Sequence, residues 1–114
     1  MKKILISLLL LVGVGVSGQE PKINTKLPIP GATLANMKLQ YDTLIPVYRV
    51  ASLKVANCNN LSVINSKVLK QPSNNNWKEE WVVNACGKNV FVPIIFTLDT
   101  YGATYMISPK DVHF

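Results

Sequence analysis

The sequence predicts a small α+β domain in which one main helix packs on a four-stranded antiparallel meander, closed by a single disulfide. Three observations carry this prediction. An apolar stripe with helical spacing occupies residues 44–56. Two apolar runs of alternating pattern flank Gly87-Lys88, as in a β-hairpin. The chain has two cysteines, Cys58 and Cys86, and its 114 residues suffice for one domain.

The first 18 residues have the features of a secretory signal peptide. Lys2 and Lys3 give a positive start, and the apolar run 4–16 is short for a membrane span. Small residues follow, which predicts cleavage after Gly18. The alternative is a retained membrane anchor, and the short apolar run disfavours it. We therefore expect a periplasmic or secreted protein with no stable membrane span, divided into a signal peptide (1–18), a Pro-rich extended arm (19–31) and a single domain (32–114).

The arm contains three prolines, one glycine and mostly polar residues. This composition favours an extended tether that docks late or not at all. A spacer left by signal cleavage and an arm that pairs with a partner both fit the pattern, so the sequence leaves the arm's role open.

The helix prediction for residues 44–56 depends on apolar side chains that recur every three or four positions: Leu44, Val47, Tyr48, Ala51 and Val55. Thr43 suits the N-cap, and Pro46 would then fall in the first turn, where its missing N–H costs nothing. We expect this helix to cover the apolar face of the sheet. Residues 33–41 show only a weak helical pattern.

The strands follow the helix as a meander. Residues 61–70 are rich in β-branched side chains, 71–76 have loop composition, and 77–96 form the central hairpin. A type II′ turn at Gly87-Lys88 would place Trp81 opposite Ile94. Side-chain alternation then gathers an apolar tryptophan face, made of Trp77, Trp81, Val83, Ala85, Val90, Val92, Ile94, Phe96 and Leu98.

A second turn is predicted at residues 99–102, with Asp at its start and Gly at its end. A four-residue loop there adds Ala103, Tyr105 and Ile107 to the tryptophan face, and we prefer it to a three-residue loop. Pro93 cannot donate to a sheet ladder, so its N–H side should face an edge or a bulge. Residues 108–114 are expected to be a tail.

Cysteine count and compartment favour a disulfide between Cys58 and Cys86. The alternatives are a redox pair or metal ligands, but the spacing is wrong for Cys-x-x-Cys and no histidine lies nearby. The formal charge of +6 falls to +4 without Lys2 and Lys3. Because the remaining basic residues are scattered, the sequence gives no support for nucleic-acid binding.

The sequence contains few residues that could form a catalytic site. The only histidine, His113, stands next to the C-terminus, and no phosphate-binding loop or set of metal ligands is evident, so we expect no cofactor and no catalytic site. One unusual residue is Glu79, which falls on the apolar face between Trp77 and Trp81. These three form a candidate binding site for a sugar or a cation. The competing interpretation is a glutamate at the sheet rim that reaches solvent or pairs with a base.

Residues 58–106 resemble a pattern seen in small exported proteins of Gram-negative bacteria, a family of unknown function. The residues that carry the resemblance are Cys58, Trp77, Glu80, Trp81, Cys86, Gly87, Asp99, Gly102 and Thr104. Ala103 departs from the family's usual second glycine in the last turn. The resemblance implies a periplasmic or secreted domain, and it carries over no catalytic residue.

The sequence thus favours an exported, non-enzymatic binding module of the cell envelope whose ligand is an envelope protein or a glycan. A structural subunit of an envelope or secretion assembly is the alternative, and a small hydrolase or toxin is the third. The sequence determines neither the ligand nor the oligomeric state, and it leaves open whether Trp77 and Trp81 are core or surface.

Overall fold

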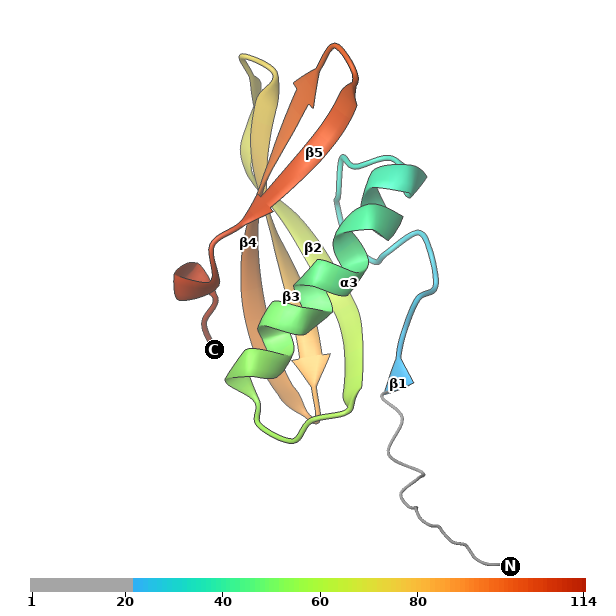
Figure 1. The fold of residues 1–114 in the computed structure, drawn as a ribbon, viewed down its shortest axis with the longest axis vertical. Coiled ribbons are helices and arrows are strands. Elements are labelled where there is room, and N and C mark those ends of the chain that lie inside the picture. The colour runs from blue at the N-terminus through green and yellow to red at the C-terminus, as the bar shows by residue number, and fades with distance from the viewer. Residues whose placement is uncertain (1–21) are drawn as a thin grey trace, which may run out of the picture.

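The computed structural model describes residues 22–114, which form an α+β fold with a helix lying across a five-stranded sheet (Figure 1). The strand order is β1-β2-β3-β4-β5. The elements in chain order are β1 (Lys22–Ile23), α3 (Met37–Lys54), β2 (Asn60–Ser73), β3 (Asn76–Ala85), β4 (Lys88–Asp99), β5 (Gly102–Ile107) and the 3-10 helix η2 (Pro109–Asp111). The predicted α+β class and main helix are confirmed.

The predicted four-stranded antiparallel sheet is wrong in one respect, because a fifth strand makes the sheet mixed. β2 to β5 form the expected antiparallel meander, but β1 adds to β2 in parallel. Lys22 and Asn24 donate backbone N–H groups to the carbonyls of Asn59 and Leu61. A two-residue strand in a Pro-rich segment has no alternation to reveal it. The described part of the predicted tether therefore lies along the β2 edge.

The helix begins seven residues earlier than predicted. Asn36 is the N-cap, and its side-chain oxygen accepts from the Leu39 N–H at 2.9 Å. The predicted cap, Thr43, is buried inside the helix and donates to the Leu39 carbonyl at 2.6 Å. Pro46 consequently lies in the helix interior, where it has no N–H for the Asp42 carbonyl. Tertiary packing of the buried face outweighs this local cost.

The turn of the central hairpin is Cys86-Gly87, one residue before the predicted position. Both residues have positive φ, 52° and 90°, as a type I′ turn requires. Trp81 therefore pairs with Val92 and not with Ile94. A shift of two positions on the opposite strand keeps every side chain on its face. The predicted tryptophan face is accordingly buried from Trp77 to Phe96, whereas Leu98 and Tyr105 are exposed.

The remaining strand ends also differ from their predicted bounds. β2 continues to Ser73, so the predicted loop 71–76 shrinks to Asn74-Asn75, which have φ of 54° and 65°. Asparagine tolerates this left-handed region. The predicted β4–β5 register is confirmed, since Leu98 pairs with Ala103 and Ile94 with Ile107.

The predicted C-terminal tail is instead held against β4. His113 and Phe91 exchange two backbone hydrogen bonds, and Val112 is buried in the core. Between the His113 bridge and β5, β4 has no partner strand on its β5 side, and Pro93 explains this gap. The β4–β5 register sets Pro93 opposite Ser108, and proline has no N–H to donate to the Ser108 carbonyl. β5 ends at Ile107, immediately before that position.

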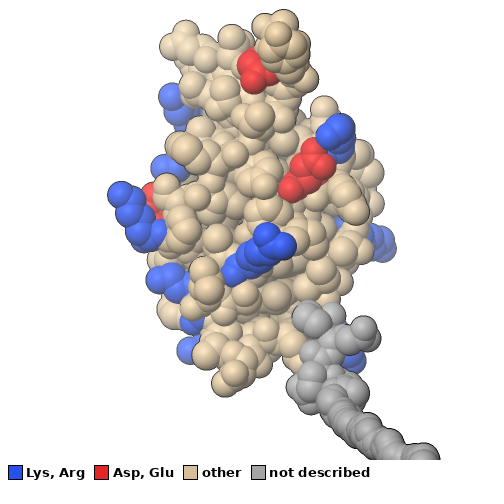
Figure 2. Space-filling model, in the orientation of Figure 1, with Lys and Arg blue, Asp and Glu red and all other residues tan. Residues whose placement is uncertain are grey.

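The core lies between α3 and the tryptophan face of the sheet. From the helix come Leu44, Val47 and Ala51, all almost fully buried. They join one cluster with the buried residues of β2, β3 and β4. Charged side chains are scattered over the outer surface, and no large basic patch is visible in Figure 2.

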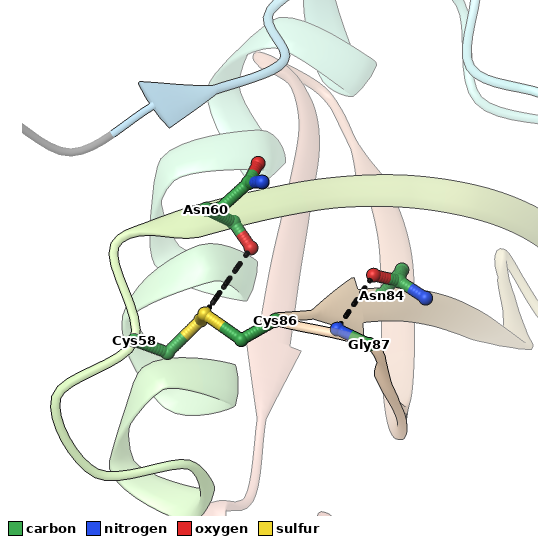
Figure 3. The surroundings of a disulfide bond; sticks show 5 residues. All are labelled: Cys58, Asn60, Asn84, Cys86 and Gly87. Carbon is green, nitrogen blue, oxygen red and sulfur yellow. Dashed lines mark hydrogen bonds between the residues drawn. A yellow bond between two sulfur atoms is a disulfide. The ribbon is translucent and has the colours of Figure 1, made fainter.

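The predicted disulfide is confirmed and joins the segment after α3 to the β3–β4 turn (Figure 3). It closes a 28-residue separation, which corresponds to roughly 3–4 kcal/mol in the chain-entropy model. Around it, the Cys86 N–H donates to the Asn60 carbonyl and the Gly87 N–H to the Asn84 side chain. The link therefore fixes the turn that sets the register of β3 and β4.

Gly31 is the closest approach between the arm and the sheet. Its φ is +103°, and an added Cβ would overlap the backbone of Ser66. Ala32 donates its N–H to the Ser66 carbonyl at 2.9 Å, and the Ser66 hydroxyl donates to the Pro30 carbonyl at 2.7 Å. At Gly31 the arm therefore lies so close to Ser66 that only the hydrogen side chain of glycine fits between them.

We expect Gly31→Ala to lower the free energy of unfolding by about 2–4 kcal/mol, because backbone strain and a steric clash add. Gly87→Ala is the matched control: its φ is +90° but the space around it is open, so strain alone should cost about 1 kcal/mol. Urea unfolding followed by tryptophan fluorescence measures both. Equal losses in the two variants would show that the arm does not dock on Ser66.

Candidate functional site

The residues predicted as a binding site come together around the buried carboxylate of Glu79. Its side chain has 0% exposure and points from β3 toward α3. The Trp81 Nε1–H donates to Oε1 at 2.9 Å, and the Trp77 Nε1–H donates to Oε2 at 2.7 Å. The backbone N–H of Leu34 adds a second bond to Oε2 at 2.8 Å. Each carboxylate oxygen is therefore satisfied.

Both tryptophans are core residues, which settles the question that the sequence left open. Trp77 is 5% exposed and Trp81 is fully buried. The Trp77 ring stacks on Phe96 with 5.1 Å between ring centres, and Trp81 contacts the same ring at 6.2 Å. Neither ring offers a surface on which a sugar could stack. A ligand would reach Glu79 only if the segment that contains Leu34 moved away.

Glu79 has no cationic partner among residues 22–114, since the ion pairs there are Lys38–Asp42 and Lys67–Glu80. Three N–H donors surround the Glu79 side chain in place of a cationic partner, and its two oxygens accept from all three. The interpretation of Glu79 as a rim residue that reaches solvent or pairs with a base is therefore wrong. The arrangement supports a structural role, because it links β3 to the segment before α3 through a bond that a shorter side chain would not reach.

Two further buried polar side chains hold the same segment. Gln40 accepts from the Ile29 N–H at 2.9 Å and donates to the Ala35 carbonyl at 2.8 Å. The Ser66 hydroxyl accepts from the Thr33 N–H at 3.1 Å. Because every buried side-chain N or O atom in the described residues has a hydrogen-bond partner, this network is complete.

Tyr48 fastens the start of the arm. Its hydroxyl donates to the Asn24 carbonyl at 2.6 Å and accepts from the Val63 N–H at 3.1 Å. Burial raises the pKa of Tyr48 above its usual value of 10.0, and the bond from Val63 acts in the opposite direction. The helix stripe predicted Tyr48 as a core residue, and its hydroxyl bridges β2 to the arm.

Catalytic groups do not gather in the described part of the chain. His113 stacks on Phe91, and both cysteines are in the disulfide. No group of three His, Cys, Asp or Glu residues that could hold a metal ion occurs within 22–114. Within the same residues, no helix combines the length and the apolar character that a membrane span requires.

The tips of the β2–β3 and β4–β5 hairpins lie at the same end of the molecule, opposite the disulfide (Figure 1), and we call this the hairpin end (Asn74, Asn75, Leu98, Thr100 and Tyr101). The Leu98 N–H donates to the Asn75 carbonyl at 2.7 Å, which joins the two tips. Tyr101 is 98% exposed, and Leu98 is also exposed. In Figure 2 this end shows a single acidic spot and is otherwise uncharged.

The outer edge of β5 is free within the described residues. Antiparallel residues alternate between facing one neighbour and facing the other. Phe91 bonds to His113 on the β5 side of β4, whereas Leu98 bonds to Asn75 on the β3 side. Odd-numbered β4 residues therefore bond to Gly102, Thr104 and Met106. The backbone N–H and C=O groups of the intervening residues point outward: Ala103, Tyr105 and Ile107.

A hollow of about 210 Å³ separates the start of β5 from the first turns of α3. It is lined by Lys38, Leu39 and Asp42 on the helix and by Tyr101 to Ala103 on the hairpin. Lys38 and Asp42 pair with each other at 2.7 Å, so neither charge is directed at a ligand. The hollow shows that the helix does not close over the β5 edge.

Sequence reasoning missed the residues that lock the arm and those that form the exposed end. Gln40 and Ser66 have no local signal, because their roles depend on contacts across the fold. The exposure of Tyr101 had a local signal, since a large aromatic in the centre of a turn has nothing to pack against.

No family model, curated protein or solved structure matches the chain. The resemblance of residues 58–106 to small exported bacterial proteins therefore stays a prediction, and the function must be argued from the described residues.

We expect Glu79→Gln to lower the free energy of unfolding by about 2–4 kcal/mol, since the amide NH₂ would face an N–H donor in either orientation. The neighbouring Glu80→Gln is the control. Glu80 is only 3.9 Å from Lys67 near the surface, and its loss should change stability by about 0.5 kcal/mol or less. Urea unfolding compares the two variants. A Glu79→Gln protein as stable as the control would refute the three-donor arrangement.

Tyr48→Phe should cost about 1–3 kcal/mol at neutral pH, because it leaves the Val63 N–H and the Asn24 carbonyl without their partner. The raised pKa of Tyr48 means that its contribution is complete below about pH 10 and falls as pH rises through the folded-state pKa. The stability gap between wild type and variant should therefore narrow in alkali. Unfolding curves from neutral to alkaline pH test this, with the exposed Tyr101→Phe as control. A gap independent of pH would contradict it.

Proposed function

We propose that this protein is an exported, non-enzymatic binding module that receives an extended segment of a protein partner along the β5 edge. The observation that carries the proposal is the row of outward backbone groups on Ala103, Tyr105 and Ile107. A free strand edge offers N–H and C=O groups at the spacing of another strand, so backbone pairing supplies the affinity. The exposed Tyr101 and Leu98 at the hairpin end extend the same surface with apolar contacts.

The two edges of the sheet differ in a way that supports binding at β5. The β2 edge carries features that discourage pairing: the arm along its first half, Lys67 and Lys70, Pro72, and register shifts against β3. β5 reads Gly-Ala-Thr-Tyr-Met-Ile and contains no charge and no proline. The β2 edge is shielded from pairing with another strand, whereas the β5 edge is not. This difference makes the β5 edge a candidate binding site.

Export rests on two features. The first 18 residues have signal-peptide composition, although they lie outside the described residues. The Cys58–Cys86 disulfide fits an oxidising compartment, such as the periplasm or the outside of the cell.

A non-enzymatic role is supported by the position of the reactive side chains. Glu79 is buried and saturated with donors, His113 is stacked on Phe91, and neither cysteine is a thiol.

A protein ligand is favoured over a glycan because Trp77 and Trp81, the two rings predicted to contact a sugar, are in the core. The alternative of a structural subunit in an envelope or secretion assembly uses the same β5 edge. Repeated head-to-tail assembly would also need the β2 edge, which the arm occupies along its first half. A small hydrolase or toxin has the least support.

A photo-crosslinking amino acid at position 105 of the full chain, expressed in a bacterial host, should give adducts of defined mass with a polypeptide. Position 41 on α3 is the control and should give none, although Tyr41 is more exposed than Tyr105, at 62% against 37%. Ala103→Pro should reduce the adducts severalfold, because it removes an outward N–H and leaves the β4 ladder intact.

The intact mass of the recovered chain tests export in the same experiment, since cleavage after Gly18 and disulfide formation both change it. Equal adducts from positions 41 and 105, or substantial hydrolase turnover by the purified mature protein, would overturn the proposed function.

A further inference from the structure

We propose that the strand received by β5 is the β5 strand of a second copy of this chain, paired antiparallel about a twofold axis at Tyr105. The inference rests on the proposed function and names its partner. Two sheets of five strands would join edge to edge into one continuous sheet. Both α3 helices would lie on the same side of it, because a twofold axis perpendicular to a sheet preserves its faces.

The free backbone groups of β5 fit this symmetry. The outward residues are Ala103, Tyr105 and Ile107, which are arranged evenly about Tyr105. Tyr105 would face Tyr105 of the second copy, and Ala103 would face Ile107 of the second copy. All of these are hydrogen-bonded positions, and each such pair exchanges two bonds. One central pair and two flanking pairs would satisfy every outward N–H and C=O group of the three residues in both copies.

The side chains permit the same register. On the helix side, two Tyr105 rings would meet across the axis, and each is 37% exposed in the single chain. On the opposite side of the sheet, Thr104 would meet Met106 of the second copy. No charged side chain lies in β5, so a protein with twelve basic and six acidic residues would bring no like charges together at this edge.

A second copy is favoured over an open chain of copies because only one edge is free along its length. The arm, Lys67, Lys70 and Pro72 obstruct the β2 edge, so a β5-to-β2 contact has no accessible counterpart. An edge that can pair only with its own kind gives a closed, isologous pair. The contact is a single short strand, so we expect a dissociation constant on the order of 10–1000 µM.

The test places charges of opposite sign at position 105, which lies on the proposed twofold axis. The mature, oxidised wild type should show a monomer–dimer equilibrium in sedimentation velocity up to about 1 mM. Tyr105→Lys and Tyr105→Glu should each weaken the dimer about tenfold or more, because like charges would face each other. An equimolar mixture of the two variants should restore a heterodimer, since Lys then faces Glu. Tyr41→Lys, which adds the same charge on α3, should dimerise like the wild type.

The outcomes separate this inference from the proposed function. A wild type that stays monomeric at 1 mM, or dimers that persist in both single variants, would overturn the inference. So would folded variants whose mixture fails to pair; urea unfolding establishes that each variant is folded. If position 105 crosslinks to a different polypeptide while the wild type remains monomeric, the binding module stands and the second copy is ruled out.

Discussion

A buried carboxylate without a counter-ion is the constraint on which the fold depends. Glu79 can be accommodated in the core only because Trp77, Trp81 and the Leu34 backbone bring three N–H donors to it. The tryptophans are therefore fixed in orientation as well as buried. The Leu34 bond draws the segment before α3 onto the sheet, which sets where the helix begins and how the arm reaches Ser66.

Specific bonds stabilise the fold at two places, and a third region has no such bonds. Gln40 and Ser66 hold the arm, and Glu79 holds the segment between the arm and α3. The Cys58–Cys86 disulfide holds the turn of the central hairpin, at the end of the molecule opposite the hairpin end. The β5 edge and the hairpin end have neither kind of support, and some of the exposed apolar side chains lie there: Leu98, Tyr101, Tyr105 and Met106. A rigid scaffold that presents one unpaired strand suits the recognition of another strand, because the backbone groups are already ordered before binding.

Local sequence patterns predicted the faces of the strands correctly, but they predicted several ends of the helix and the strands at the wrong residues. The Cys86-Gly87 turn needs positive φ at a cysteine, which no sequence rule favours, so the turn was predicted one residue late. The resulting register error was two positions, and alternation with period two is unaffected by such a shift. Thr43 and Pro46 form a plausible helix start, yet Asn36 caps the helix, and the buried side chains of Leu39 and Gln40 extend its buried face by one turn.

The sequence by itself determined the α+β class, the tryptophan face, the β4–β5 register and the disulfide. Each depends on periodicity or on residue counts, which are properties of neighbours along the chain. Only the tertiary structure decided the parallel β1, the burial of Glu79, the docking of the arm and the free β5 edge. Those features depend on which distant segment supplies a hydrogen-bond partner. The Leu34 N–H that completes the Glu79 site is 45 residues away in the chain, and no local pattern records it.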